Sequence, residues 1–531
     1  MINKHKTTFI YGIILAIVIH FYAFSNMIIN HDGVNAFLTG ESVAHNVGLG
    51  RFMEVLLLYI SDVPSLPAVI GVLSSIALAV SCCLLSELFD LETKIARFMA
   101  SAVVISFPVA ANTFCYQYLA DAFFIAMLCA CAGAYLMKRY GMKAIFPAVL
   151  LLFTACGIYQ AYWSFGAVLL FLIFLQEMLK DSFTPKKFFL RGICLAAPLI
   201  ISLAGYALVN KAVQAILRVE ANGYQGLDQM GNLGGLREIY WTARFTYAEY
   251  LKFFFKFGGM RESRLLVAIN VMLFLLMAFL LVKLFFRQKR HWYETLIFFL
   301  CVLLCPGILN ILSFISNNVL HAVMMYAFVL PYLIVISLGE YASTVFKDSK
   351  AFFISLPQKH FFHFETHQNA ASLSRLMILA LVAVVAYSGY LTTNKIYLRQ
   401  QLNYETTSSY MTRLVLRMET SQDFDPDKPM CFINESCQPS EHIILLGTAP
   451  AEMAVFDDLK NMVGVNEGTM IKNERDMFDF IKGFMGLSYI RADDDFREAV
   501  MVSQAFADMP CYPEEGFLRE IDGNLVIKLP Y

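Results

Sequence analysis

Long apolar runs separated by short polar connections make up most of the first 393 residues. Several runs reach about 20 residues, the length that an α-helix needs to cross the hydrocarbon core of a bilayer. The pattern therefore predicts a mainly α, polytopic membrane protein of about 11 transmembrane helices. The predicted spans are about 8–28, 66–89, 98–113, 119–137, 144–158, 161–178, 190–210, 263–285, 293–313, 322–343 and 375–393. The third and fifth are short, which is typical of tilted, broken or re-entrant segments.

The composition agrees with a chain that lipid surrounds. Hydrophobic residues make up 58% of the 531 residues and charged residues only 16%, whereas soluble domains carry about 25% charged residues. The net charge of −1 gives no reason to expect a nucleic acid partner. We therefore expect the lipid bilayer as a partner.

Lysine and arginine are unevenly distributed among the loops. If the N-terminus is cytoplasmic, the short outer loops carry Arg51 and almost no other basic residue. The inner loops carry Lys4, Lys6, Lys94, Arg97, Lys138, Arg139, Lys143, Lys180, Lys186, Lys187, Arg191, Arg287, Lys289, Arg290, Lys347, Lys350, Lys359 and Arg375. This asymmetry follows the positive-inside rule. With an odd number of spans, it predicts that the C-terminus lies on the outer side.

The outer connection at about 211–262 is long and rich in aromatic residues. Its second part, "LREIYWTARFTYAEYLKFFFKF", has helical periodicity with one polar face, which Phe245 interrupts. That face consists of Glu238, Thr242, Glu249, Lys252 and Lys256. An aromatic amphipathic helix of this kind is expected to lie in the membrane interface. It is either an anchor without chemistry or part of a sugar or lipid platform with Tyr224, Tyr240 and Trp241.

Residues 394–531 are much more polar than the 1–393 bundle and predict a small C-terminal α+β domain. Short apolar strands ("HIILLGTA", "NLVIKL") alternate with a helical stretch ("ERDMFDFIKGFMG"), and Asp522-Gly523 marks a turn. Disulfides persist outside the cytoplasm. Cys431 and Cys437 therefore predict a local disulfide, and Cys511 is an alternative partner.

Polar residues gather where the predicted spans reach the outer side. The loop at about 29–61 begins with "NHDG", which contains His31 and Asp32, and later carries Arg51 and Glu54. Other outer connections add Gln117, Asp121, Tyr159, Gln160 and His321. Ionisable residues near a span are costly and are therefore functional candidates. Each also has a structural explanation: Asp121 as a helix cap, His321 as a partner of the backbone, Arg51 as a contact of lipid phosphates. Their convergence on one side favours a reaction site.

Several stretches in order along the chain resemble the serotype-converting glucosyltransferases that decorate bacterial O-antigen, a polytopic family of the GT-C class. These are Asp32 after the first span, "GRF", "FPVAANTFCYQYLADAFF", "GIYQAYW", "NYETTSSYMTRLVLRM", "ILLGTAP" and "MPCYPEEGFLREIDGNLVIKL". One feature departs from the family, because such enzymes often show two adjacent acids where this chain has His31 before Asp32. The missing second acid counts against a divalent metal bound in the family's usual way. Mg²⁺ or Mn²⁺, with Asp32 as its ligand, is therefore kept only as an alternative to a site without a metal.

The resemblance implies transfer of a sugar, usually glucose, from a polyprenyl-phosphate carrier to lipid-linked O-antigen. It implies the periplasmic side of the bacterial inner membrane and inversion at the anomeric carbon. Asp32 is then expected as the catalytic base and Asp121 as a second carboxylate. The donor phosphate is assigned to Arg51, or to Arg237 and Arg244. The remaining substrate contacts are assigned to His31, Gln117, Tyr159, Gln160 and His321.

The alternative is a polytopic transporter, flippase or polymerase of lipid-linked glycans. A transporter is expected to show polar residues near the middle of the bilayer and two related halves with broken helices. Here the charged residues lie at the outer ends of the spans, and no internal repeat is visible. These features favour the transferase.

Overall fold

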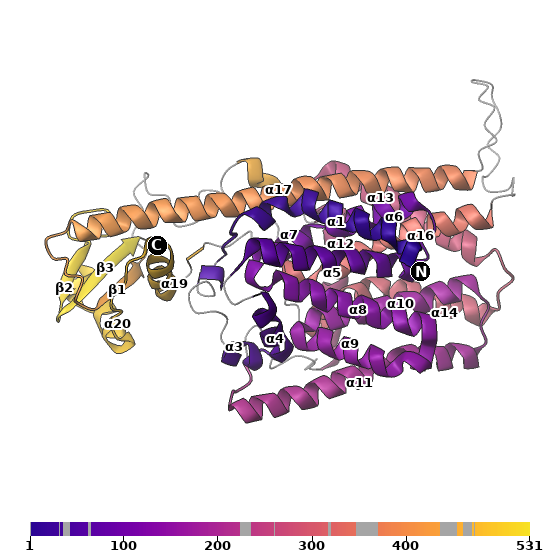
Figure 1. The fold of residues 1–531 in the computed structure, drawn as a ribbon, viewed down its shortest axis with the longest axis horizontal. Helices are drawn as coiled ribbons and strands as arrows, with labels where there is room; N and C mark the ends of the chain where they lie inside the picture. The colour runs from indigo at the N-terminus through magenta and orange to yellow at the C-terminus, as the bar shows by residue number, and fades with distance from the viewer. Residues whose placement is uncertain are drawn as a thin grey trace, which may run out of the picture.

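Long helices run side by side in one bundle, and a small sheet domain lies at the end of the longest helix (Figure 1). This computed structural model describes residues 2–30, 32–34, 43–61, 65–222, 235–259, 261–316, 320–346, 370–435, 454–459, 470–471 and 473–530. The N-terminus lies at the end of the bundle that faces away from the sheet domain (Figure 1).

The bundle is built from twelve long or medium helices. They are α1 (Ile2–Ser25), α5 (Pro67–Leu88), α6 (Lys94–Ile105), α7 (Pro108–Cys115), α8 (Ala120–Tyr140), α9 (Ile145–Ile158), α10 (Gln160–Lys180), α11 (Pro185–Leu217), α13 (Arg264–Phe285), α14 (Trp292–Leu309), α16 (Leu330–Val345) and α17 (Ala370–Glu419). The other elements of this part are the 20-residue helix α12 (Leu236–Phe255) and the short elements α3 (Val43–Gly48), α4 (Phe52–Ser61), η1 (Gln117–Leu119), η2 (Gly141–Ala144), α15 (Ile311–Ile315), η4 (Ala322–Met324) and η5 (Tyr326–Val329).

The number of spans agrees with the sequence pattern. Among the described residues, nine helices are long and apolar enough to cross a membrane, or ten if α6 and α7 form one bent span. One of the nine, Gln117–Ile158, contains both α8 and α9. These two helices pack against one another across the short turn η2, where Gly141 has a φ of 58°. Counted separately, they bring the number to the predicted eleven.

The predicted span 98–113 is a broken helix, because α6 and α7 meet at an angle of 42°. Pro108 has no N–H, so the carbonyl of Val104 loses its helical partner. The hydroxyl of Tyr326 donates to that carbonyl at 2.9 Å, and His20 Nε2 donates to the carbonyl of Ile105 at 2.9 Å. Every backbone polar group within a bilayer needs such a partner, and these two side chains supply it.

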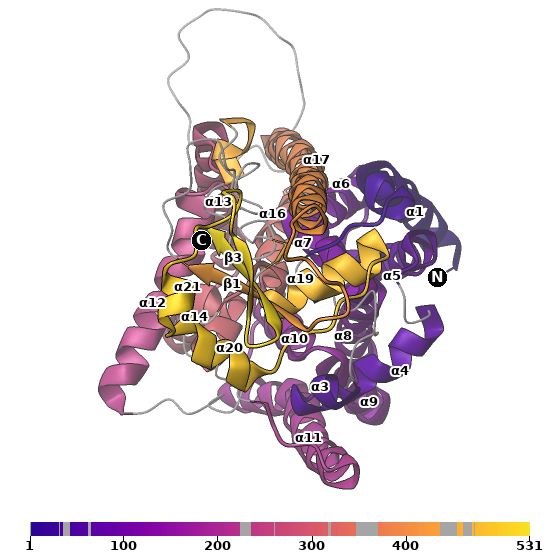
Figure 2. The same ribbon diagram turned by 90° about the vertical axis from the view of Figure 1, so that its left-hand side faces the viewer.

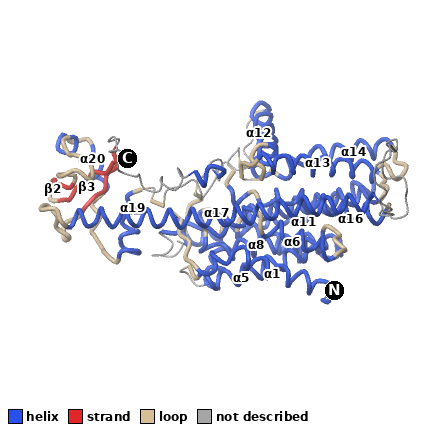
Figure 3. Tube along the Cα trace, turned by 90° about the horizontal axis from the view of Figure 1, so that it is seen from above, coloured by secondary structure: helices blue, strands red, loops and turns tan. Residues whose placement is uncertain are grey.

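Helix α12 runs across the bundle axis, as Figures 2 and 3 show. The following helix, α13, has 22 residues, which gives about 33 Å of rise, close to the thickness of the hydrocarbon core. Helix α12 packs against α13, α14 and α15, and its position in the membrane interface stays a prediction. Tyr240 and Trp241 are exposed, but Thr242 of the predicted polar face is buried, so that prediction is wrong at this position.

Helix α17 has 50 residues, or about 75 Å of rise, and it continues from the bundle into the C-terminal domain without a break (Figure 1). The predicted boundary at 393/394 falls inside this helix. The elements that follow are β1 (Met430–Glu435), η6 (Ala454–Leu459), α19 (Glu474–Phe480), the π-helical turn η7 (Ile481–Met485), α20 (Asp494–Met501), α21 (Gln504–Ala507), β2 (Leu518–Ile521) and β3 (Asn524–Pro530).

The three strands form one sheet in the order β1-β3-β2, with β1 parallel and β2 antiparallel to β3. The predicted turn at Asp522 and Gly523 joins β2 and β3, and both residues have positive φ (49° and 80°), as a type I′ turn requires. The helical stretch from 474 and the strand "NLVIKL" are confirmed as α19–η7 and β3. The other predicted strand, 442–449, lies outside the described residues.

The predicted disulfide between Cys431 and Cys437 is wrong, because Cys431 is a free and buried thiol. Side chains alternate between the two faces of a strand, and Cys431 packs with Val500 and Phe506 on the face covered by α20 and α21. Burial raises the pKa of the Cys431 thiol to about 12, with the nearby Glu474 carboxylate as a smaller cause. Cys511 is disulfide-bonded, and Cys437 lies outside the described residues.

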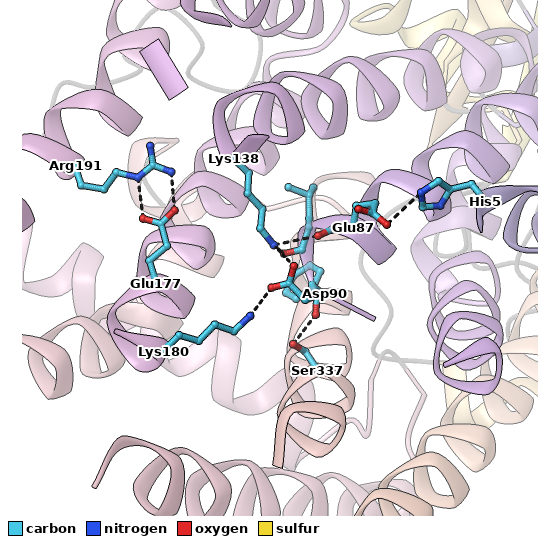
Figure 4. A network of polar contacts seen from close by, with 10 residues as sticks. His5, Glu87, Asp90, Lys138, Glu177, Lys180, Arg191 and Ser337 are labelled. Carbon is cyan, nitrogen blue, oxygen red and sulfur yellow. Dashed lines mark hydrogen bonds and ion pairs between the residues drawn. The ribbon is translucent and has the colours of Figure 1, made fainter. Parts of the chain in front are cut away.

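Ion pairs join the helices at the end of the bundle that holds the N-terminus (Figure 4). Asp90 follows α5 and accepts from Lys138 of α8 at 2.7 Å and from Lys180 of α10 at 2.5 Å. Arg191 makes a bidentate pair with Glu177, at 2.6 and 2.8 Å. Burial by itself raises the pKa of the Asp90 carboxyl, but the two ammonium groups hold that pKa below its usual range. These basic residues are therefore part of the scaffold.

Candidate functional site

The turn that carries Asp32 follows α1 at the end of the bundle nearest the C-terminal domain. The Asn30 side chain is buried, and its Oδ1 accepts from the N–H of Gly33 at 2.7 Å. Val34 N–H donates to the carbonyl of Asn30 at 3.2 Å, which closes one turn of helix. Asp32 is exposed at this turn. The structure therefore gives its carboxylate access to solvent, whereas His31 lies outside the described residues.

Gln117 holds the end of α1 in place. Its Nε2 donates to the carbonyls of Ala23 at 2.7 Å and Asn26 at 3.0 Å, and its Oε1 accepts from the N–H of Ile28 at 3.1 Å. The side chain is 1% exposed. Gln117, predicted to contact the substrate, instead fixes the chain four residues ahead of Asp32.

The turn ahead of Arg51 is tied to α10 and α11. Gln160 Nε2 donates to the carbonyl of Leu49 at 2.8 Å and to the hydroxyl of Tyr206 at 2.9 Å. The Tyr206 hydroxyl donates in turn to the carbonyl of Gly50 at 3.1 Å. Gly50 has a φ of 78°, and a Cβ there would lie 2.3 Å from the Tyr206 hydroxyl, so only glycine fits. Gln160 therefore positions Arg51.

Arg51 and Tyr159 lie in direct contact. The Arg51 guanidinium carbon lies 4.8 Å from the centroid of the Tyr159 ring. Tyr159 also stacks on Phe123, with 4.5 Å between ring centroids and 8° between planes. Phe123 is two residues beyond Asp121 on α8. The stack therefore connects the arginine to the helical turn that carries the second predicted carboxylate.

Asp121 lies in the first turn of α8 and is 2% exposed. Its carboxylate faces Ser61, the last residue of α4, and the backbone N–H groups of Asp121 and Ala122. The buried carboxylate thus lies between the N-terminus of α8 and the last residue of α4. These contacts connect Arg51, Tyr159 and Gln160 with the α8 turn that carries Asp121.

Glu54 is a further acidic residue of this region. It lies on α4, is 0% exposed, and its backbone N–H donates to the carbonyl of Arg51 at 3.0 Å. In the sequence it is the single charged residue of the apolar stretch "FMEVLLLYI". A charged residue inside an apolar stretch marks a candidate functional residue. The sequence pattern alone, however, gave no reason to prefer Glu54 over Asp32.

The other predicted phosphate ligands lie elsewhere. Arg237 and Arg244 are exposed on α12, where the Arg244 guanidinium carbon lies 4.9 Å from the centroid of the Trp241 ring. Helix α12 packs against α13, α14 and α15, and Figure 2 shows it on a different side of the bundle from α3 and α4. These arginines therefore do not join the group around Arg51. His321 is half-buried ahead of η4, which packs against α7.

An open groove lies where α12 leads into α13. It encloses about 510 Å³ and is lined by Phe255, Lys256, Glu262, Ser263, Arg264 and Val267. The predicted interfacial position of α12 would put this groove at headgroup depth. Within the described ranges, no three His, Cys, Asp or Glu side chains gather in a way that could hold a metal ion.

The fold and the site define a polytopic α-helical membrane protein that gathers carboxylates and an arginine at one end of its bundle. A family model described as Glucosyl transferase GtrII matches residues 21–332, which include Asp32, Arg51 and Asp121. The chain belongs to this family and is a glucosyltransferase of the kind that modifies O-antigen. The matched range ends inside α16, ahead of α17 and the C-terminal domain. No curated protein and no solved structure matches the chain.

Proposed function

We propose that the protein transfers glucose from a polyprenyl-phosphate carrier to O-antigen or a related surface polysaccharide on the periplasmic side of the bacterial inner membrane. The observation that carries this proposal is that the group of Asp121, Arg51 and Tyr159 lies at the same end of the bundle as the Asp32 turn, within the range that matches the family. A donor that diffuses in the bilayer fits a site at the end of a helical bundle.

The proposed orientation in the membrane follows from the distribution of basic residues. Lys138, Lys180 and Arg191 lie at the end of the bundle that holds the N-terminus, opposite the Asp32 turn (Figures 1 and 4). Basic residues accumulate on the cytoplasmic side, so we assign that end to the cytoplasm. The C-terminal domain, from about residue 394, is then periplasmic, and residues 1–393 form the catalytic membrane part.

The proposed reaction is a single displacement with inversion. The acceptor hydroxyl oxygen attacks the anomeric carbon of glucose while the bond from that carbon to the phosphate oxygen breaks. A carboxylate takes the hydroxyl proton, because the neutral hydroxyl is a poor nucleophile. Asp32 suits this role, since it is exposed and a water-soluble glycan can reach it. The leaving group is polyprenyl phosphate.

The two predicted phosphate sites suggest different paths for the carrier. The Tyr159 stack connects Arg51 to the α8 turn of Asp121, so a phosphate held at Arg51 leaves the sugar at the end of the bundle that carries Asp121 and Asp32. Arg237 and Arg244 lie at headgroup depth on α12, where they suit a first encounter with anionic lipid. We assign the reacting phosphate to Arg51. Charge-assisted contacts stabilise the reaction most at the atoms where negative charge develops, which here are those of the leaving phosphate.

The test is a transfer assay with membranes that contain the protein. Polyprenyl-phosphate glucose carrying labelled glucose is supplied with O-antigen acceptor, and the linkage in the product is read by NMR. We expect labelled polysaccharide whose new bond has the anomeric configuration opposite to that of the donor. Retained configuration would contradict the single displacement. Carrier movement across the membrane without transfer would instead identify a flippase.

A further inference from the structure

Two apolar residues that flank the Asp32 turn belong to the hydrophobic core of the C-terminal domain. Ile29 is 5% exposed and Val34 is 0% exposed. Both lie in one cluster with Leu414 of α17, Phe432 of β1 and other residues of that domain. Among the described members of this cluster, only these two precede α17 in the chain. The C-terminal domain therefore packs directly on the turn that carries the proposed base.

The bundle holds the same segment from the other side. Gln117 accepts from the N–H of Ile28 and donates to two carbonyls of the chain leading to it. Beyond this clamp, Ile29 enters the C-terminal core, the Asn30 side chain closes the turn, and Val34 enters the core again. The exposed Asp32 thus lies between two buried anchors, one on each side.

The C-terminal domain is itself tied to the bundle at a second point. Asp458 of η6 accepts from Lys395 of α17 at 2.8 and 2.9 Å and forms an ion pair with Arg261, with 2.6 Å between Nε and the carboxylate oxygen. Phe456 and Leu459 of the same element pack into the core of the bundle. Helix α17 runs without a break from the bundle core, where Tyr397 packs, to the domain core, where Leu414 packs, so the domain core is a firm support.

We propose that Ile29 and Val34 are positioning residues through which the C-terminal domain holds the Asp32 carboxylate in place for catalysis. This rests on the proposed function of Asp32. A general base acts only within hydrogen-bond reach of the proton that it takes, and a displacement of about 1 Å can lower the rate by about 100-fold. The domain outside the matched family range then contributes to the reaction without touching the substrate.

The experiment compares two fully buried valines in the full-length protein. Val34→Ala loosens the anchor of the turn, whereas Val526→Ala makes the same change on the opposite face of the sheet, among Cys431 and Phe506. Hydrogen–deuterium exchange at the amides of residues 33 and 34 reports the order of the turn. We expect Val34→Ala to accelerate this exchange and Val526→Ala to leave it unchanged.

Kinetics provide the second measurement. Val34→Ala is expected to lower kcat by about 10- to 100-fold with KM for donor and acceptor within about twofold, because the residue contacts neither substrate. Ile29→Ala is expected to behave likewise. Ile29→Val, which retains most of the buried surface, is expected to stay close to the wild type. A merely structural role would lower the amount of active protein equally for both valine variants.

The outcomes separate this proposal from the proposed function. Unchanged exchange at residues 33 and 34 in Val34→Ala, or an equal loss of kcat in Val526→Ala, would overturn it. Should Val34→Ala fail to accumulate, Leu414→Ala tests the same anchor from the side of the domain by the same exchange measurement. If the wild-type protein transfers no glucose, the proposed function fails, while the exchange data still decide whether the domain holds the turn.

Discussion

Arg51 and Tyr159 form a cation–π pair, with 4.8 Å between the guanidinium carbon and the ring centroid. The two residues are more than 100 positions apart in the sequence. An arginine that stacks on a ring presents its N–H donors in the guanidinium plane, and this planar fork matches the geometry of a phosphate. The pair therefore gives the guanidinium a fixed orientation beside the α8 turn of Asp121.

Replacing Arg51 tests its assignment to the donor phosphate. A hydrogen bond to a charged group contributes about 1.5–3 kcal/mol, so we expect Arg51→Ala to lower kcat/KM for the donor by about 10- to 100-fold. Arg51→Lys retains the charge but loses the planar stack, and we expect an intermediate loss. Arg139→Ala, an exposed arginine at the opposite end of the bundle, is the control. A larger loss in Arg244→Ala than in Arg51→Ala would move the phosphate to α12.

Asp32→Asn removes the charge of the proposed base with little change in size. The loss of a general base lowers the rate by about 100- to 10,000-fold, and we expect this loss in the transfer assay at equal protein abundance. Asp495→Asn, at an exposed aspartate of α20, serves as the matched control. Full modification of the polysaccharide by Asp32→Asn would exclude Asp32 as the base.

Asp121→Asn distinguishes a functional carboxylate from a helix cap. Asparagine caps a helix about as well as aspartate does, so a purely structural Asp121 predicts nearly normal transfer and normal thermal stability for this variant. We expect instead a severe but incomplete loss of transfer, because the buried negative charge beside Ser61 is removed. The two quantities to compare are the transfer rate and the midpoint of thermal unfolding in detergent.

Thiol labelling tests the state of the cysteines in the C-terminal domain. With a pKa raised to about 12 by burial, Cys431 is protonated throughout the neutral range, and the thiolate is the reactive form. We expect Cys431 to resist maleimide at pH 7 to 8 in the native protein and to react after unfolding. Cys511 is expected to react only after reduction. Labelling of native, unreduced protein at Cys511, detected by peptide mass spectrometry, would contradict its disulfide.

Reporter fusions test the proposed orientation. Fusions after Gly33, Lys289 and Gly486 are expected to report the periplasm, the cytoplasm and the periplasm, in that order. The expectation follows from eleven crossings and from the basic residues at the end that holds the N-terminus. A cytoplasmic signal at Gly486 would require an even number of crossings, which would contradict the assignment of Asp32 and the C-terminal domain to the same side.

The local sequence pattern was sufficient to predict the elements whose structure the lipid environment or the backbone geometry determines. A run of apolar residues long enough to cross a bilayer has few alternatives to a helix, because no water is present to pair with its backbone. The turn at Asp522-Gly523 was equally readable, since both residues accept positive φ. The helix α12 was predicted from its periodicity, but its inward face was not, because Thr242 is buried against neighbouring helices.

The sequence by itself determined the membrane class of the protein, its approximate spans and the side on which its polar residues gather, since these depend on composition and short-range periodicity. Only the tertiary structure decided what each polar residue contacts. Gln117 clamps α1 rather than facing a substrate, Cys431 points into a core rather than toward a disulfide, and Ile29 anchors the Asp32 turn in a distant domain. Such contacts join residues far apart in the chain, and packing selects them through shape and burial, which no local period records.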